Sequence, residues 1–138
     1  RGTNSYDKYL NYFSEKFIVP AAAIDALEHV NNLSYLQWCL DAAGKHWISK
    51  STKQLREDYV WVVLNHSIFY KASAFEGEEL EITTWVANCE GVKSERHYKI
   101  IRLKDNKTLI EAKTIWCLLN RKKHRPTKIT QEIATLFL

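Results

Sequence analysis

The chain has 138 residues, which suits a single domain over residues 1–138 and leaves little room for two. Hydrophobic residues make up 46% of the chain and charged residues 26%, a composition typical of a globular domain, which excludes a disordered one. The formal net charge is +4, and the excess is concentrated in residues 120–128. Such a basic segment attracts a phosphate-bearing partner, either a nucleic acid or a nucleotide-containing cofactor.

The sequence contains no run of about 18 apolar residues and no charged start followed by an apolar stretch, so it predicts neither a membrane span nor a signal peptide. Three cysteines, Cys39, Cys89 and Cys117, cannot all pair and form no CxxC motif, so we expect reduced thiols in a cytoplasmic protein. No cluster of His, Cys or acidic residues has the spacing of metal ligands, and no metal site is predicted.

The first predicted elements are a strand and a long helix. Residues 10–19 mix aromatic and β-branched side chains and end before Pro20, a pattern typical of a strand. Asn31 and Asn32 favour a helix start, because an Asn side chain accepts hydrogen bonds from the free amides of the first turn. Apolar residues then recur at helical spacing up to about Lys50, so we expect a largely enclosed helix. Its apolar face comprises Leu36, Leu40, Ala43 and Trp47, widened by Tyr35, Cys39 and Ala42.

Extended segments predominate in the rest of the chain. Residues 51–58 predict a polar connection, and residues 59–71 predict a strand whose apolar beginning is expected to be covered on both faces. Further strands are predicted at residues 80–86, 94–103 and 108–119, followed by a short helix at residues 131–137. Short Gly or Asx turns between the later strands favour antiparallel neighbours. One strand, one long helix and four strands in a meander predict an α+β fold.

The loop before the long helix is the segment most suited to chemistry. A helix start exposes unpaired backbone amides and a partial positive charge, and such amides can hold a developing oxyanion. Asp25 lies about six residues before this start, close enough for its carboxylate to reach the same space. There it could attack a carbonyl group or activate a water molecule. The alternative is an Asp that only caps the helix or forms a loop hydrogen bond.

The pattern Asp25-x-x-x-His29-Val30-Asn31-Asn32-x-x-Tyr35 opens this helix. It resembles the 4-hydroxybenzoyl-CoA thioesterase family of hotdog proteins and is similar to the related acyl-carrier-protein thioesterases. The resemblance implies a hotdog fold, in which an antiparallel sheet of five to six strands wraps a long central helix. It also implies hydrolysis of an acyl thioester to a free acid and a thiol. No separate cofactor is implied, because coenzyme A or an acyl-carrier protein enters as part of the substrate.

The resemblance also assigns roles to individual residues. Asp25 matches the nucleophile or general base, and the backbone amide of Asn32 matches the group that polarises the thioester carbonyl. His29 matches a histidine of the plant-type carrier-protein enzymes, although a structural histidine bonded to the loop backbone is the alternative. The residues predicted to contact the substrate are Asn31, Tyr35, Asn65, His66, Lys93, Ser94, Arg125 and Lys128.

Several of these contacts depend on a second chain. Relatives pair two chains edge to edge and build each site from both, so the resemblance implies a homodimer, or a tetramer of paired dimers. Lys93, Ser94, Arg125 and Lys128 fall where relatives contact the nucleotide of coenzyme A, and they could serve the site of the neighbouring chain. Asn65 and His66 would either line the acyl site of the adjoining chain or form a structural bond across strands.

The motif also departs from the family pattern. Ala23 stands where many members have an Asp, Leu27 stands at the Asn position of the carrier-protein pattern, and Glu28 stands where many members have a Gly that permits unusual torsions. These departures motivate an alternative, a hotdog protein that binds acyl-CoA without hydrolysing it. A nucleic-acid-binding protein is disfavoured, because the basic run is short and the aromatic residues lie in apolar strand patterns.

Overall fold

The computed structural model of the protein describes residues 11–138, so residue 10 of the predicted first strand lies outside the described part. The first half of the chain forms a strand, a short 3-10 turn and two helices. In chain order these are β1 (Phe13–Ile18), η2 (Ala21–Ala23), α1 (Asn32–Lys50) and α2 (Lys53–Asp58). The second half contains five strands and a last helix, namely β2 (Tyr59–Tyr70), β3 (Glu79–Glu90), β4 (Lys93–Arg102), β5 (Lys107–Asn120), β6 (Arg125–Pro126) and α3 (Gln131–Phe137).

Helix α2 was not predicted from the sequence, since residues 51–58 were expected to form a polar connection. Thr52 caps this helix by accepting a hydrogen bond of 3.1 Å from the amide of Leu55. Leu55 is buried and packs in a small cluster against α3 and the end of β5. A single buried residue and a cap therefore stabilise six helical residues that show no apolar periodicity of their own.

The strands form one six-stranded antiparallel sheet in the order β1-β3-β4-β5-β2, with β6 paired to β5. The predicted four-strand meander is therefore wrong in one respect, because β2 pairs with β5 rather than with β3. Strands β3, β4 and β5 are joined by tight turns that contain Gly91 (φ 62°) and Asn106 (φ 55°), which make them neighbours. The connection at residues 71–78 is longer and lets β2 lie at the far edge.

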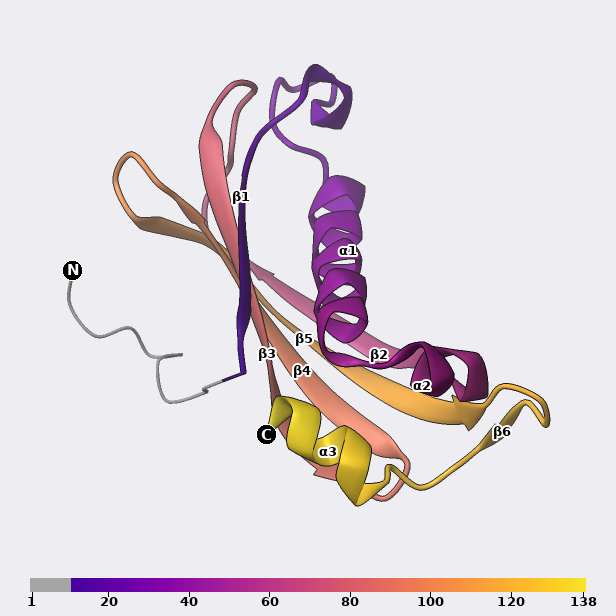
Figure 1. Ribbon diagram of the computed structural model, residues 1–138. Helices are drawn as coiled ribbons and strands as arrows, with labels where there is room; N and C mark the ends of the chain where they lie inside the picture. The colour runs from indigo at the N-terminus through magenta and orange to yellow at the C-terminus, as the bar shows by residue number, and fades with distance from the viewer. Residues whose placement is uncertain (1–10) are drawn as a thin grey trace.

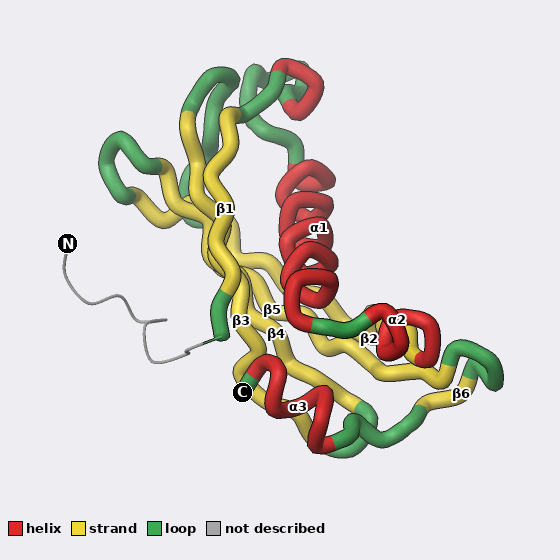
Figure 2. Tube along the Cα trace, in the orientation of Figure 1, coloured by secondary structure: helices red, strands yellow, loops and turns green. Residues whose placement is uncertain are grey.

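The sheet curls around α1, which lies along one of its faces (Figure 1). Helices α2 and α3 lie near the C-terminal end of α1, whereas η2 and the loop before α1 lie near its N-terminal end (Figure 2). The most deeply buried side chains of α1 are Tyr35, Cys39, Ala42, Ala43 and His46. This face is centred about one position away from the predicted one, and the opposite face of α1 is exposed rather than enclosed.

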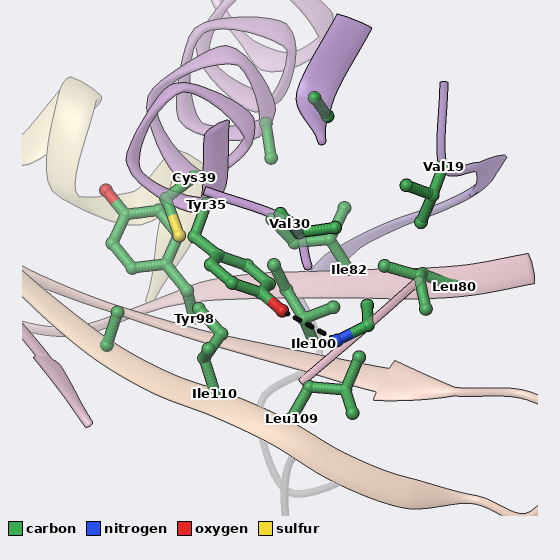
Figure 3. Packing of buried hydrophobic residues seen from close by; sticks show 14 of the residues in the cluster. Val19, Val30, Tyr35, Cys39, Leu80, Ile82, Tyr98, Ile100, Leu109 and Ile110 are labelled. Carbon is green, nitrogen blue, oxygen red and sulfur yellow. Dashed lines mark hydrogen bonds between the residues drawn. The ribbon is translucent and has the colours of Figure 1, made fainter. Parts of the chain in front are cut away.

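The main core lies between α1 and the strands (Figure 3). The hydroxyl group of Tyr35 accepts a hydrogen bond of 3.1 Å from the backbone amide of Ala74, which connects α1 to the β2–β3 connection. The apolar side chains that surround this bond include Val19, Val30, Leu80, Ile82, Ile100, Leu109 and Ile110. Among the described residues, no helix has the length and apolar character of a membrane-spanning segment.

Strand β2 lies at an edge of the sheet, so the expectation that its apolar run is covered on both faces is wrong for the isolated chain. Val63 is 42% exposed, Leu64 52% and Phe69 75%. The register also shifts between Val63 and Asn65, which leaves Leu64 in a bulge opposite β5. An apolar edge strand presents unpaired backbone groups to any further strand that approaches it.

Candidate active site

The loop that leads into α1 is held to the helix by Asn31. Its side-chain oxygen accepts a hydrogen bond of 2.8 Å from the amide of Ser34, and its side-chain amide donates one of 2.9 Å to the carbonyl oxygen of Ala23. The backbone amide of Asn31 donates a further bond of 2.9 Å to the same carbonyl. Both ends of this side chain are therefore engaged, and the predicted contact of Asn31 with substrate would have to replace these bonds.

The cap leaves two donors free at the electropositive end of α1. Asn32 is the first residue of the helix and is exposed. Within residues 11–138, neither the backbone amide of Asn32 nor that of Leu33 has a hydrogen-bond acceptor. Unpaired amides at a helix N-terminus point toward solvent and favour a negative partner. These two amides are consequently available to a ligand.

Asp25 lies in a tight loop immediately before the helix. Its backbone amide donates to the carbonyl of His29 at 2.9 Å, and its carbonyl accepts from the amide of Glu28 at 3.0 Å. Its carboxylate oxygen Oδ1 accepts a hydrogen bond of 2.8 Å from the amide of Leu27. The loop hydrogen bond that was the alternative role for Asp25 is therefore present. The second oxygen, Oδ2, makes no hydrogen bond to the described residues, and the side chain is exposed.

Glu28 occupies the position where many relatives have Gly, and its backbone retains the torsion that Gly would favour. Its φ angle is 66°, in the left-handed region. A side chain in this region costs roughly 1–2 kcal/mol relative to the right-handed conformation. The left-handed turn is therefore formed with Glu at this position, and it keeps Asp25 next to the helix start.

The structure brings together four of the predicted site residues. Asp25, His29, Asn32 and Tyr35 line a cleft of about 420 Å³. The ring of His29 is half-buried and meets the ring of Phe75 edge-on, with 5.2 Å between the ring centroids. Tyr35 contributes mainly its ring, because its hydroxyl is engaged by Ala74. Burial raises the pKa of Tyr35, so this hydroxyl stays neutral.

The opposite wall of the cleft was not anticipated. It is formed by residues 70–73, at the end of β2 and the start of the connection to β3. Lys71 brings a positive charge to this wall and pairs with Glu111 at 3.2 Å, both side chains being about half exposed. No motif marks this segment, because long-range contacts bring it to the cleft, namely the pairing of β2 with β5 and the bonds of Ala74 to Val30 and Tyr35.

Asn65 and His66 do not line the cleft within this chain. His66 Nδ1 lies 2.6 Å from the hydroxyl oxygen of Thr114 on β5, so the strand-crossing bond proposed as one of its two roles is confirmed. Burial lowers the pKa of His66. Its Nε2 atom is buried without a partner among the described residues. Asn65 is exposed on the outer strand, directly after the bulge.

The predicted nucleotide contacts lie far from Asp25 within one chain. Lys93 begins β4 and Arg125 begins β6, and both elements start near the C-terminal end of α1, whereas Asp25 precedes its N-terminal end (Figure 1). Lys93, Arg125 and Lys128 are exposed, but Ser94 is buried and lines a different pocket. Their contact with the nucleotide of coenzyme A, in the site of this chain or of a neighbouring chain, stays a prediction.

A long helix on a curled antiparallel sheet is the arrangement of a hotdog domain, and in this chain a carboxylate lies in the loop before the free amides of that helix. The chain belongs to the acyl-ACP thioesterase family, since the model of the acyl-ACP thioesterase N-terminal domain matches residues 10–137. The chloroplastic acyl-[acyl-carrier-protein] hydrolase of Cuphea viscosissima is 26% identical over 131 residues, which are 95% of this chain. The chain spans only 28% of the length of that relative.

Solved structures support the same fold. A 1,4-dihydroxy-2-naphthoyl-CoA thioesterase from Synechocystis has a TM-score of 0.79 at 19% identity, covering 91% of this chain and 94% of that one. A 12:0-ACP thioesterase from Umbellularia californica has a TM-score of 0.81 at 17% identity, covering 93% of this chain and 51% of that one. At these identities the likeness establishes the hotdog fold, and the expected fold class is confirmed. The chain corresponds to nearly the whole of the first structure and to about half of the second.

Proposed function

We propose that this chain hydrolyses acyl thioesters of coenzyme A or of an acyl-carrier protein to a free acid and a thiol. Membership of the acyl-ACP thioesterase family supports this function. The observation that carries the proposal is that Asp25 and the helix start at Asn32 line one cleft. A carboxylate beside unpaired amides is the arrangement that acyl transfer requires, with one group for attack and another for the developing negative charge.

In this mechanism the amides of Asn32 and Leu33 bind the thioester carbonyl oxygen. Their hydrogen bonds strengthen as that oxygen becomes negative, which lowers the barrier rather than only tightening substrate binding. Oδ2 of Asp25 then acts in one of two ways. It attacks the carbonyl carbon, expelling the thiolate and forming a mixed anhydride that water cleaves, or it removes a proton from an attacking water. In both routes the thiolate takes up a proton and leaves as a thiol.

The proposal includes a second hotdog unit that completes the site. Asp25 is exposed in the single chain, and the apolar edge of β2 has no neighbour among the described residues. Pairing along β2 in a homodimer, or in a tetramer of paired dimers, would cover Leu64 and Phe69 and bring cationic residues of one unit toward the cleft of the other. The half-length match to the Umbellularia californica thioesterase is consistent with two such units. The proposed location is the cytoplasm, since the three cysteines form no disulfide.

A second candidate function is acyl-CoA binding without hydrolysis. The bond from Leu27 to Asp25 supports it, because this bond gives the carboxylate a structural role in the loop. The exposure of Asp25 in the single chain and the absence of an acid at Ala23 point in the same direction. The two functions differ in whether a thiol is released.

A thiol-release assay across acyl-CoA and acyl-carrier-protein chain lengths tests the proposal. Asp25→Asn keeps an oxygen for the Leu27 bond but removes the charge, so it should lower the rate roughly 10²–10⁴-fold, the usual contribution of a general base. Glu28→Gln is the matched control, since it removes the charge of an exposed neighbour in the same loop, and its rate should stay near that of the wild type. Equal rates for the wild type and Asp25→Asn, or no thiol release by either, would refute the role of Asp25.

A further inference from the structure

A second pocket lies at the other end of α1 and shares no lining residue with the Asp25 cleft. Its volume is about 250 Å³, and its walls come from α1, α3 and strands β2 to β5. An apolar cavity of roughly 150 Å³ admits benzene, so by proportion this pocket admits about ten heavy atoms. Most of the walls are apolar or aromatic, including Leu40, Trp47, Trp61, Val86, Trp116 and Phe137.

Two arginines line this apolar space: Arg96, which is buried, and Arg121, which is exposed and donates to the backbone carbonyl oxygens of Arg56 and Tyr59. Arg96 on β4 lines the pocket and is only 6% exposed. Its guanidinium donates hydrogen bonds to Nδ1 of His46 at 2.9 Å and to the hydroxyl oxygen of Thr84 at 3.2 Å. The ring of Phe137 lies 5.6 Å from the guanidinium carbon. Within residues 11–138, no Asp or Glu lies within ion-pair distance of Arg96, and none lines the pocket.

The partners of Arg96 do not neutralise its charge. Burial lowers the pKa of Arg96 to about 10, so the guanidinium remains protonated near neutral pH. Burial, together with the charge of Arg96, lowers the pKa of His46 to about 3, so this imidazole is neutral. Because Nδ1 of His46 accepts from Arg96, its proton is on Nε2, which is buried and has no partner among the described residues. The pocket wall therefore carries a buried cation that no acidic side chain among the described residues compensates.

A buried ion without an opposite charge destabilises a core, and an apolar residue of similar size usually stabilises it better. A charge kept at such a position indicates that a bound molecule supplies the opposite charge. A carboxylate matches the planar guanidinium with two parallel hydrogen bonds. The aromatic and aliphatic walls suit a hydrocarbon chain attached to it.

We propose that this second pocket binds an aliphatic carboxylate of about eight carbons, with Arg96 as its counter-ion. The bound carboxylate is either a free fatty acid or the far end of an acyl group that carries a terminal carboxylate. The free fatty acid and the carboxylated acyl group share the carboxylate head group. Binding of either one in this pocket does not require Asp25. The proposed thioester hydrolysis releases a carboxylic acid, so the free acid would be a product held by the same domain.

Direct binding of octanoate tests this inference, with calorimetry as the readout and the fluorescence of the wall residues Trp47, Trp61 and Trp116 as a second signal. Octanoate should bind the wild type at least about tenfold more tightly than octanamide, a difference of ~1.4 kcal/mol. Arg96→Met should remove this preference and leave octanamide binding unchanged. The surface control Lys53→Met, which removes an exposed charge on α2, should retain it.

Equal affinity of the wild type for octanoate and octanamide would overturn the proposal without recourse to any variant. Retention of the octanoate preference in Arg96→Met would overturn it as well. Folding of the variant is checked by thermal unfolding, and the loss of an unpaired buried charge should leave the midpoint unchanged or raised. Asp25→Asn should bind octanoate like the wild type, so failure of the proposed hydrolysis and failure of this pocket are separate results.

Two non-hydrolysable thioethers of pantetheine, one with an octyl and one with a 7-carboxyheptyl group, distinguish the two sources of the carboxylate. A pocket for the end of a carboxylated acyl group predicts tighter binding of the 7-carboxyheptyl compound by the wild type but not by Arg96→Met. A pocket for free fatty acid predicts equal binding of the two thioethers together with the octanoate preference. The inference would be overturned if the wild type preferred neither octanoate over octanamide nor the 7-carboxyheptyl thioether over the octyl thioether.

Discussion

The side-chain oxygen of Asn31 accepts a 2.8 Å hydrogen bond from the backbone amide of Ser34, and this cap determines which amides of α1 remain free. It satisfies the third amide of the helix and leaves those of Asn32 and Leu33 without acceptors in the described part of the chain. The two adjacent asparagines thus have different roles. Asn31 acts through its side chain, whereas the proposed role of Asn32 depends on its backbone alone.

Asn32→Pro tests the backbone role of Asn32. Proline is tolerated at the first position of a helix, and Asn31 has the extended torsions (φ −75°, ψ 156°) that a following proline requires. The variant should therefore fold normally, yet lose roughly 10²–10³-fold in thioester hydrolysis, the usual cost of one missing oxyanion donor. Asn32→Ala keeps the amide and should retain activity. Similar rates for the two variants would contradict the proposed role of this amide.

Asn31→Ala should destabilise the protein. It removes the cap to Ser34 and the side-chain bond to Ala23, so the free energy of unfolding should fall by about 1–2 kcal/mol. Urea unfolding measures this value. Asn32→Ala is again the control, because the side chain of Asn32 is exposed and its loss should change stability by less than about 0.5 kcal/mol. A neutral effect of Asn31→Ala would mean that the cap is redundant.

Glu28→Gly should stabilise the loop next to Asp25. It relieves the left-handed strain at φ 66° but adds freedom to the unfolded chain, so the net gain should lie between zero and about 1 kcal/mol. Glu28→Ala removes the same side chain while keeping the strain, and it should bring no gain. Chemical denaturation gives the free energy of unfolding of each variant, and the difference between the two variants is the contribution of the backbone torsion. Destabilisation by Gly but not by Ala would show that the torsion carries no strain.

Stability should fall on acidification because His46 is buried and neutral. Its pKa is about 3 in the folded protein and 6.5 at its ordinary value. The unfolded chain therefore binds more protons between these values, and the contribution of His46 is complete above pH 6.5 and lost as the pH falls toward 3. The slope is at most about 1.4 kcal/mol per pH unit for this residue.

Urea unfolding between about pH 7 and pH 5 should show this slope in the wild type and a smaller one in His46→Gln. The Gln carbonyl can still accept from Arg96 but does not titrate. His124→Gln is the matched control at an exposed position and should keep the wild-type slope. Identical slopes in all three proteins would exclude His46 as the cause.

Leu64→Lys tests the proposed pairing along β2. A charge on an edge strand opposes association with another strand, so the variant should be monomeric and at least about tenfold less active. Ile18→Lys is the matched control, because Ile18 is an apolar residue, 63% exposed, on the opposite edge strand β1. Sedimentation gives the oligomeric state. Dissociation by Ile18→Lys but not by Leu64→Lys would place the interface on the other edge.

Local patterns in the sequence determined several elements closely. The pair Asn31-Asn32 marked the start of α1, and residues 131–137 were predicted as the helix that the structure shows as α3. Gly91 and Asn106 marked turns that make β3, β4 and β5 neighbours. Each of these features depends on interactions within a few residues, namely caps, torsions and side-chain spacing, so the sequence alone contains the information.

Other features were decided only by the tertiary structure. Strand β2 crosses to the far edge of the sheet and leaves Leu64 exposed, although its apolar run indicated a covered strand. Arg96 and His46 meet at 2.9 Å across fifty positions of sequence, and no local pattern connects them. Predicted site residues such as Asp25 and Lys93 lie at opposite ends of α1. The physical reason is that strand order and long-range packing depend on burial summed over the whole domain, whereas propensity and spacing report only on neighbours in the chain.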